Sequence, residues 1–164
     1  MKLLALAAFI GAAIVSHGAV AHGPSKPGSP STASTDNEEL STPFGRPGDP
    51  KSVNRTVTIL MSDTMRFSPD SLSVKQGEIF RFAVKNDGRL LHEMVLGNQR
   101  SLQEHAALMR KFPEMAHDEP YMVHVEPGKT GEMVWAFDKA GEIDFACLIP
   151  GHFDAGMTGK VIAK

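Results

Sequence analysis

The sequence predicts an all-β domain, a two-sheet antiparallel β-sandwich with one short helical insertion. Two observations favour this fold. Short segments carry apolar residues at every second position, which is the period of a strand, and Gly or Pro turns separate them. One stretch alone shows helical spacing, so the chain contains little helix. Many short strands with regular turns are typical of sandwiches.

The strands are expected between Val53, where the folded region begins, and the carboxyl end. Turns follow several of them directly, as at Gln76-Gly77 and Pro127-Gly128. The predicted strands cover 56–61, 71–75, 80–84, 91–96, 121–125, 133–137, 143–147 and 160–163. One helix is predicted over 101–112, because Ser101 and Glu104 form a capping-box pattern and Pro113 ends the periodic stretch.

The amino terminus has the layout of a secretory signal peptide. Lys2 supplies a positive start, an apolar run covers 3–15, and Ala19-Val20-Ala21 is a small-x-small cleavage site. A membrane anchor is the alternative, but the apolar run is too short to span a bilayer comfortably. We therefore expect residues 1–21 to be a signal peptide and the mature protein to occupy an oxidising compartment, the bacterial periplasm.

Residues 22–52 are expected to form a disordered arm, and residues 53–164 the folded domain. The arm holds six prolines among Ser, Thr, Gly and Asp, and its few apolar residues cannot offset the entropy cost of ordering. The whole chain has 164 residues, a formal charge of −2 and one cysteine. This balance argues against a partner that is a nucleic acid or an anionic membrane surface. No stable membrane insertion is expected either, because the one apolar run belongs to the signal peptide. One cysteine excludes an intrachain disulfide or a four-cysteine cluster.

The residues with the clearest chemistry are Cys147, His152 and Met157, which form a C-x4-H-x4-M loop between the last two predicted strands. His92 opens an upstream strand after the Asn86-Asp87-Gly88 turn. Thiolate and thioether sulfur suit Cu(I), and imidazole suits both oxidation states of copper. Two histidines and a cysteine with a distant methionine make up the blue-copper type of electron-transfer centre, so His92, Cys147, His152 and Met157 are the predicted copper ligands.

Other chemistries fit these residues less well. A buried cysteine alone is most often a small hydrophobic residue. Zinc accepts cysteine and histidine but not methionine. A cysteine hydrolase needs a third orienting group and an oxyanion pocket, and no upstream motif suggests either.

The loop resembles that of the cupredoxins, and most of all the azurin and auracyanin group. The residues that carry the resemblance are His92 and, in the loop, Cys147, Pro150, Gly151, His152 and Met157. The resemblance implies a Greek-key sandwich with one type-1 copper below its rim, and a partly exposed His152 through which electrons leave. Two positions beside His92 depart from the family. Glu93 stands where an asparagine commonly ties the ligand loops together, and Leu91 stands where azurin has glycine.

A second group of copper-binding residue types lies between positions 109 and 124. It contains Met109, Met115, His117, Met122 and His124, and a second copper site near Met109, Met115 and His117 is one interpretation. The other interpretation is ordinary packing of Met109 and Met122 with a solvated His117, since methionine is a common filler of cores.

Two functions follow as hypotheses. The first is a periplasmic electron carrier that cycles one copper between Cu(I) and Cu(II) and exchanges electrons with redox partners such as cytochromes. The second is a copper-handling or copper-tolerance protein that sequesters or oxidises periplasmic copper, with the Met/His-rich insert as a second site. We expect no enzymatic activity, because copper nitrite reductases require a further all-histidine site and a second domain.

Overall fold

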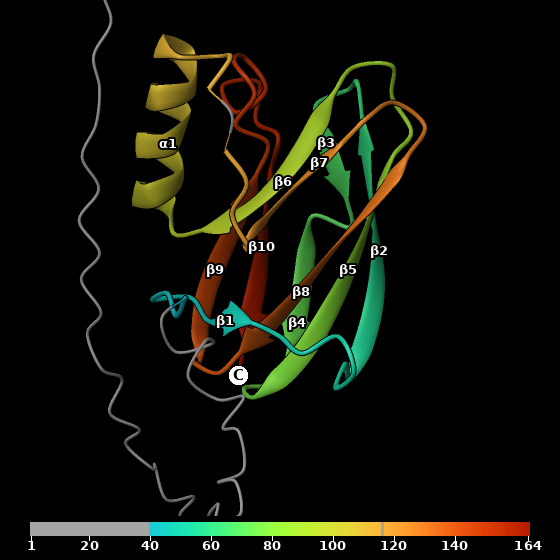
Figure 1. Ribbon diagram of the computed structural model, residues 1–164, viewed down its shortest axis with the longest axis vertical. Helices are drawn as coiled ribbons and strands as arrows, with labels where there is room; N and C mark the ends of the chain where they lie inside the picture. Colours follow the sequence, from blue (N-terminus) through green and yellow to red (C-terminus); the bar gives the residue numbers. More distant parts are fainter. Residues whose placement is uncertain (1–39, 116) are drawn as a thin grey trace, which may run out of the picture. The chain divides into compact units, whose positions relative to one another are not determined.

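The computed structural model describes residues 40–115 and 117–164, and the predicted signal peptide and most of the predicted arm lie outside them. Two five-stranded sheets pack face to face, with one helix beside them (Figure 1). No helix in the described part of the chain is long and apolar enough to cross a membrane. The elements are β1 (Arg46–Pro47), β2 (Arg55–Ser62), β3 (Arg66–Ser68), β4 (Ser71–Val74), β5 (Glu78–Asn86), β6 (His92–Gly97), α1 (Gln99–Lys111), β7 (Met122–Val125), β8 (Thr130–Phe137), β9 (Gly141–Ala146) and β10 (Thr158–Ala163).

The sandwich predicted from the sequence is confirmed, with a difference in strand direction. One sheet has the order β1-β8-β5-β2-β3 and the other has the order β4-β10-β9-β6-β7. Most neighbouring strands are antiparallel, but β2 pairs with β5 and β4 pairs with β10 in parallel. The predicted antiparallel sandwich therefore contains two parallel pairings that the sequence did not indicate. Apolar alternation shows which face of a strand is buried, but it carries no information on the direction of the neighbouring strand.

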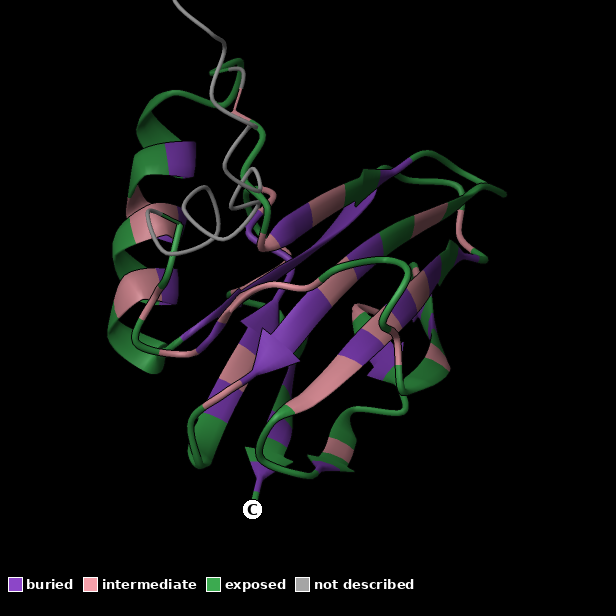
Figure 2. Cartoon of the chain, turned by 60° about the horizontal axis from the view of Figure 1, so that its bottom comes forward, coloured by how far each residue is buried: buried purple, intermediate pink, exposed green. Residues whose placement is uncertain are grey.

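The core lies between the two sheets and is rich in aromatic side chains. Phe80, Phe82, Trp135, Phe137 and Phe145 are all fully buried. Figure 2 shows buried residues alternating with exposed ones along several strands, as the sequence pattern predicts. This rigid sandwich fixes the ends of β6 and β9, which carry the predicted copper ligands.

Strand β6 is buried along its whole length, because each of its faces has a different partner. Met94 and Leu96 point into the main core, whereas Val95 packs with Leu102 and Ala106 of α1. Helix α1 therefore covers the outer face of its sheet beside β6. Consecutive residues of β6 face opposite sides of the sheet, so the side chains of His92 and Glu93 lie in different environments.

Helix α1 begins two residues earlier than the sequence pattern indicates. Asn98 is the N-cap, and its side chain accepts a hydrogen bond from the backbone N–H of Ser101 at 2.9 Å. Ser101 is the third helical residue of the capping box, and its hydroxyl accepts from the Asn98 backbone N–H at 3.1 Å. Glu104 pairs instead with Arg100 at 2.9 Å. Ser101 is therefore not the N-cap that the sequence pattern predicts. Asn98, three residues earlier, is an equally good N-cap residue and takes that position.

The folded region also begins earlier than Val53. Strand β1 pairs with β8, and the Phe44 ring stacks on Trp135 with 5.7 Å between ring centroids. The indole N–H of Trp135 donates to the Phe44 carbonyl oxygen at 3.1 Å. The predicted disordered arm therefore does not extend to residue 52. The composition of the segment suggested disorder because it has few apolar residues, but one partly buried aromatic ring is enough to anchor it.

Replacing Phe44 with alanine should lower the free energy of unfolding by about 2 kcal/mol, because the ring is only partly buried against Trp135 and Tyr121. Urea unfolding of the copper-free protein measures this change. Leu40→Ala is the matched control, since Leu40 is exposed. Equal stabilities of the two variants would contradict the anchoring role of Phe44.

Candidate metal centre

The loop after β9 folds back so that its two ends are hydrogen-bonded to each other. The Cys147 backbone N–H donates to the Met157 carbonyl oxygen at 3.1 Å, and the Met157 N–H donates to the His152 carbonyl oxygen at 3.1 Å. Gly151 has a φ of +90°, a left-handed conformation that favours glycine and turns the chain before His152. The loop spacing therefore brings Cys147, His152 and Met157 to one place.

Three of the predicted ligands converge at this place. One ligand atom each from His92, Cys147 and His152 lies within 4.8 Å of the other two. The Sγ atom of Cys147 is 3.2 Å from Nδ1 of His152, and the rings of His92 and His152 are 4.9 Å apart at their centroids. Met157 is fully buried in the same core cluster as Cys147.

His92 is oriented by a carboxylate outside the cluster. Its Nε2 lies 3.2 Å from Oδ1 of Asp63, so the ring donates its proton there. Its Nδ1 is buried and has no hydrogen-bond partner among the described residues. A buried acceptor without a partner is costly, and a metal ion would satisfy its lone pair. The pairing of one ring nitrogen with a carboxylate is the usual arrangement of a metal-binding histidine.

The turn before β6 holds His92 in position. The side-chain amide of Asn86 donates to the carbonyl oxygens of Leu90 at 2.7 Å and Val125 at 2.8 Å, and its oxygen accepts from the Gly88 N–H at 2.8 Å. Asp63 accepts a hydrogen bond from the Arg89 N–H at 2.8 Å. These contacts, chiefly the bond from Arg89, lower the pKa of Asp63, which therefore stays ionised opposite His92.

The protonation states of the cluster suit a cation. Burial raises the pKa of the Cys147 thiol to about 12, against the smaller opposing effect of the Glu93 N–H, which donates to Sγ at 3.5 Å. Burial, and then the proximity of His92, lower the pKa of His152. Two imidazoles and a buried thiol form a soft and borderline ligand set. These residues fit copper.

Copper binding should release about one proton per ion near pH 8, because the Cys147 thiol is protonated and must become a thiolate, while His152 is already neutral. The apparent affinity should then rise about tenfold per pH unit in this range. Calorimetric titration in buffers of different ionisation enthalpy counts the protons. Binding without proton release would mean that the thiol is not a ligand.

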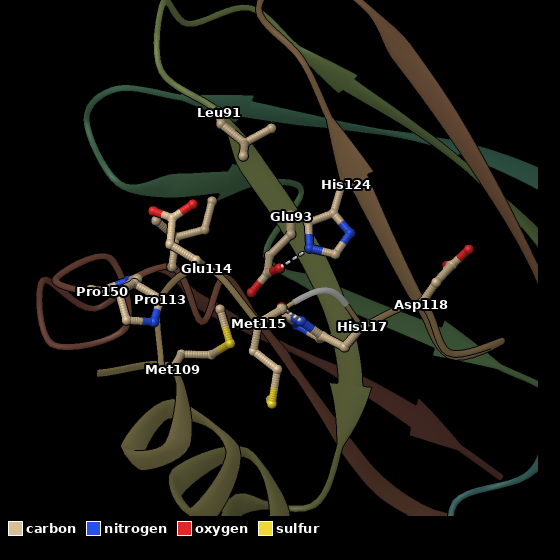
Figure 3. Close-up of a pocket in the computed structure, with 11 residues that line it drawn as sticks. Leu91, Glu93, Met109, Pro113, Glu114, Met115, His117, Asp118, His124 and Pro150 are labelled. Carbon is tan, nitrogen blue, oxygen red and sulfur yellow. Dashed lines mark hydrogen bonds and ion pairs between the residues drawn. The ribbon is translucent and has the colours of Figure 1, made fainter. Parts of the chain in front are cut away.

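The Met/His-rich insert is only partly available for metal binding. Met109 and Met122 are buried and pack with α1 and β6, as the packing interpretation expects. Met115 is exposed, and His117 is half-buried beside His124 of β7. Figure 3 shows Met109, Met115 and His117 around one pocket with Glu93. Glu93 was not predicted as a ligand from the sequence, although the residue departs from the family pattern at this position.

Asp63→Asn should weaken Cu(II) binding roughly tenfold or more, because the amide cannot accept all the hydrogen bonds that orient His92 and the preceding turn. Asp87→Asn is the matched control, since Asp87 lies in the turn before β6 but pairs with Lys85 and not with His92. Competition with a copper chelator measures both affinities. Equal affinities would show that Asp63 does not position His92.

Known proteins that are similar to this chain in sequence are named as copper proteins. The model of the copper-binding plastocyanin/azurin family matches residues 54–164. A copper-resistant cuproprotein CopI of Rubrivivax gelatinosus is 53% identical over 126 residues, which are 77% of this chain and 76% of the relative. The protein of the same name from Pseudomonas aeruginosa is 35% identical over 150 residues, 74% of this chain and 82% of the relative.

Solved structures with the same fold are also cupredoxins. Auracyanin B has a TM-score of 0.62 at 19% identity and covers 73% of this chain and 96% of its own. Reduced auracyanin of Roseiflexus castenholzii has a TM-score of 0.59 at 16% identity, and the match covers 68% of this chain and 98% of the auracyanin. The resemblance to the azurin and auracyanin group is confirmed. With a family model that matches from before β2 to the last residue, the chain belongs to the plastocyanin/azurin family of copper-binding proteins.

Proposed function

We propose that this protein is a periplasmic copper-tolerance protein that sequesters copper at the centre formed by His92, Cys147, His152 and Met157. The observation that carries the proposal is the similarity to two relatives named copper-resistant cuproproteins, at 53% and 35% identity over most of each chain. The amino-terminal pattern of a signal peptide supports export to the periplasm. No enzymatic turnover is part of the proposal.

Each residue has a distinct role in holding the ion. Cys147 supplies a thiolate, and His92 and His152 supply Nδ1 lone pairs from the two sides of the cluster. Met157 supplies a distant thioether. Bound copper would contribute a Cu(I)/Cu(II) couple, and the soft sulfur ligands favour the reduced state. Asp63 and Asn86 keep the ligand loops in place before the ion arrives.

An electron carrier is the second candidate. The observation that favours it is the position of His152, which is half-buried at the rim while Cys147 and His92 are fully buried. Such an edge lets electrons pass between the ion and a docked protein. Reduction of the copper-loaded protein by a cytochrome would support this function.

The decisive experiment is deletion of the gene in the source organism. The copper-tolerance proposal expects the deletion strain to stop growing at copper concentrations that the parent tolerates, and to recover with the wild-type gene. Normal growth on copper together with impaired respiratory electron transfer would overturn it in favour of the carrier.

A further inference from the structure

A second group of ligating side chains lies on the other face of the sheet from the first centre. Glu93 of β6 and His124 of β7 are direct cross-strand partners, and His117 reaches them from the segment between α1 and β7. One ligand atom from each of the three lies within 4.8 Å of the other two. Figure 3 shows the three side chains converging at the pocket.

Glu93 is a charged group in an unusual place. Its side chain is fully buried, and Oε1 accepts a hydrogen bond from the Leu148 N–H at 2.8 Å. Oε2 lies 2.8 Å from Nε2 of His124, which is its only ionic partner among the described residues. The two atoms are close, but their geometry is not that of a hydrogen bond. A buried carboxylate requires a compensating positive charge, and a cation bound by both atoms would supply it.

His117 has one nitrogen free for such a cation. Its Nδ1 lies 2.7 Å from the Met115 carbonyl oxygen and donates its proton there, so the lone pair is on Nε2. Nε2 is buried and has no hydrogen-bond partner in the described part of the chain. A histidine fixed by a backbone carbonyl with its other nitrogen unpartnered has the usual orientation of a metal ligand.

From these contacts we propose a second metal site, for Cu(II), with Glu93, His117 and His124 as ligands. Atoms bound to one ion at about 2 Å lie about 3 Å from each other, which matches the separation of Glu93 and His124. Two imidazoles and a carboxylate contain no soft atom, so the set favours Cu(II) over Cu(I), and copper binds such sites more tightly than other divalent metals of its row. The adjoining pocket of about 560 Å³ is open to solvent, so an ion can reach the three side chains from the surface.

The two centres share a connection through Glu93. Its backbone N–H donates to Cys147 Sγ, and its carboxylate accepts from the next residue of the loop, Leu148. His92 thus belongs to the first centre on one face of β6, and the Glu93 side chain belongs to the second group on the opposite face. The choice of copper as the cation deepens the proposed function and rests on it, whereas the ligand geometry does not.

The test is a calorimetric titration of the full chain with Cu(II), followed by electron paramagnetic resonance. The wild type should bind one more equivalent than His117→Ala or His124→Ala, with a signal typical of nitrogen and oxygen ligands and no added charge-transfer band. Glu93→Gln should lose the same equivalent, because it keeps the shape and the Leu148 contact but not the charge. A charge-transfer band of the first centre that is retained shows that each variant is folded.

His105→Ala is the matched control, because the His105 ring lies 4.9 Å from that of His117 but is outside the ligand group. It should keep the extra equivalent. If all variants bind as many ions as the wild type, the second site is overturned and Glu93 and His124 form an ordinary ion pair. Copper sensitivity of the deletion strain would still stand in that case, so failure of this site and failure of the proposed function are distinguishable.

Discussion

Cys147→Ser is expected to abolish the intense thiolate-to-copper charge-transfer absorption of the Cu(II)-loaded protein completely. The band requires a sulfur anion bound to copper, and Cys147 is the only cysteine of the chain. Serine is close in size, so the buried position beside Phe145 should still pack. The optical spectrum of the loaded variant measures the effect, and the same variant should fail to restore copper tolerance to a deletion strain.

A matched control keeps this result specific. Met133→Leu also changes a buried sulfur-containing residue, but it lies on β8 in the core and outside the ligand cluster. This variant should retain the band and the tolerance. A Cys147→Ser protein that keeps full copper tolerance would show that the first centre is not responsible for it.

The second large effect is expected for Asn86→Ala, which should lower the free energy of unfolding by about 3 kcal/mol. The Asn86 side chain is fully buried and satisfies the carbonyl oxygens of Leu90 and Val125 and the Gly88 N–H, and each loss leaves a polar group without a partner. The turn before His92 should also loosen, so copper should bind more weakly. Urea unfolding and chelator competition measure the two effects.

Asn98→Ala is the control for this change, because it also removes an asparagine but at the exposed N-cap of α1. It should cost about 1 kcal/mol and leave copper affinity unchanged. If Asn86→Ala is no less stable than Asn98→Ala, the turn is held by contacts other than those of Asn86.

The alternation of residues such as Phe80, Phe82 and Val84 made the strands and the sandwich predictable, because a buried face requires a period of two. Strand direction and the pairing of β1 were not predictable. Strand direction depends on the connections between distant strands. The pairing of β1 depends on a contact between Phe44 and Trp135, which are 91 positions apart in the sequence. Short-range patterns do not contain such contacts.

For the site, the spacing of Cys147, His152 and Met157 was informative because one loop carries all three. Asp63 was not foreseen, since a carboxylate on the turn between β2 and β3 carries no local signal of its contact with His92. The grouping of Glu93 with His124 depends on strand register, which the sequence pattern leaves open. Local motifs therefore predict ligands that share a loop, and the fold supplies the residues around them.

X-ray absorption at the copper edge, on the full chain loaded with one equivalent of copper, tests the central claim most directly. The account predicts one short copper–sulfur distance and two imidazole nitrogens in the nearest shell. A shell of nitrogen and oxygen atoms without sulfur would contradict it, because Cys147 would then not hold the ion.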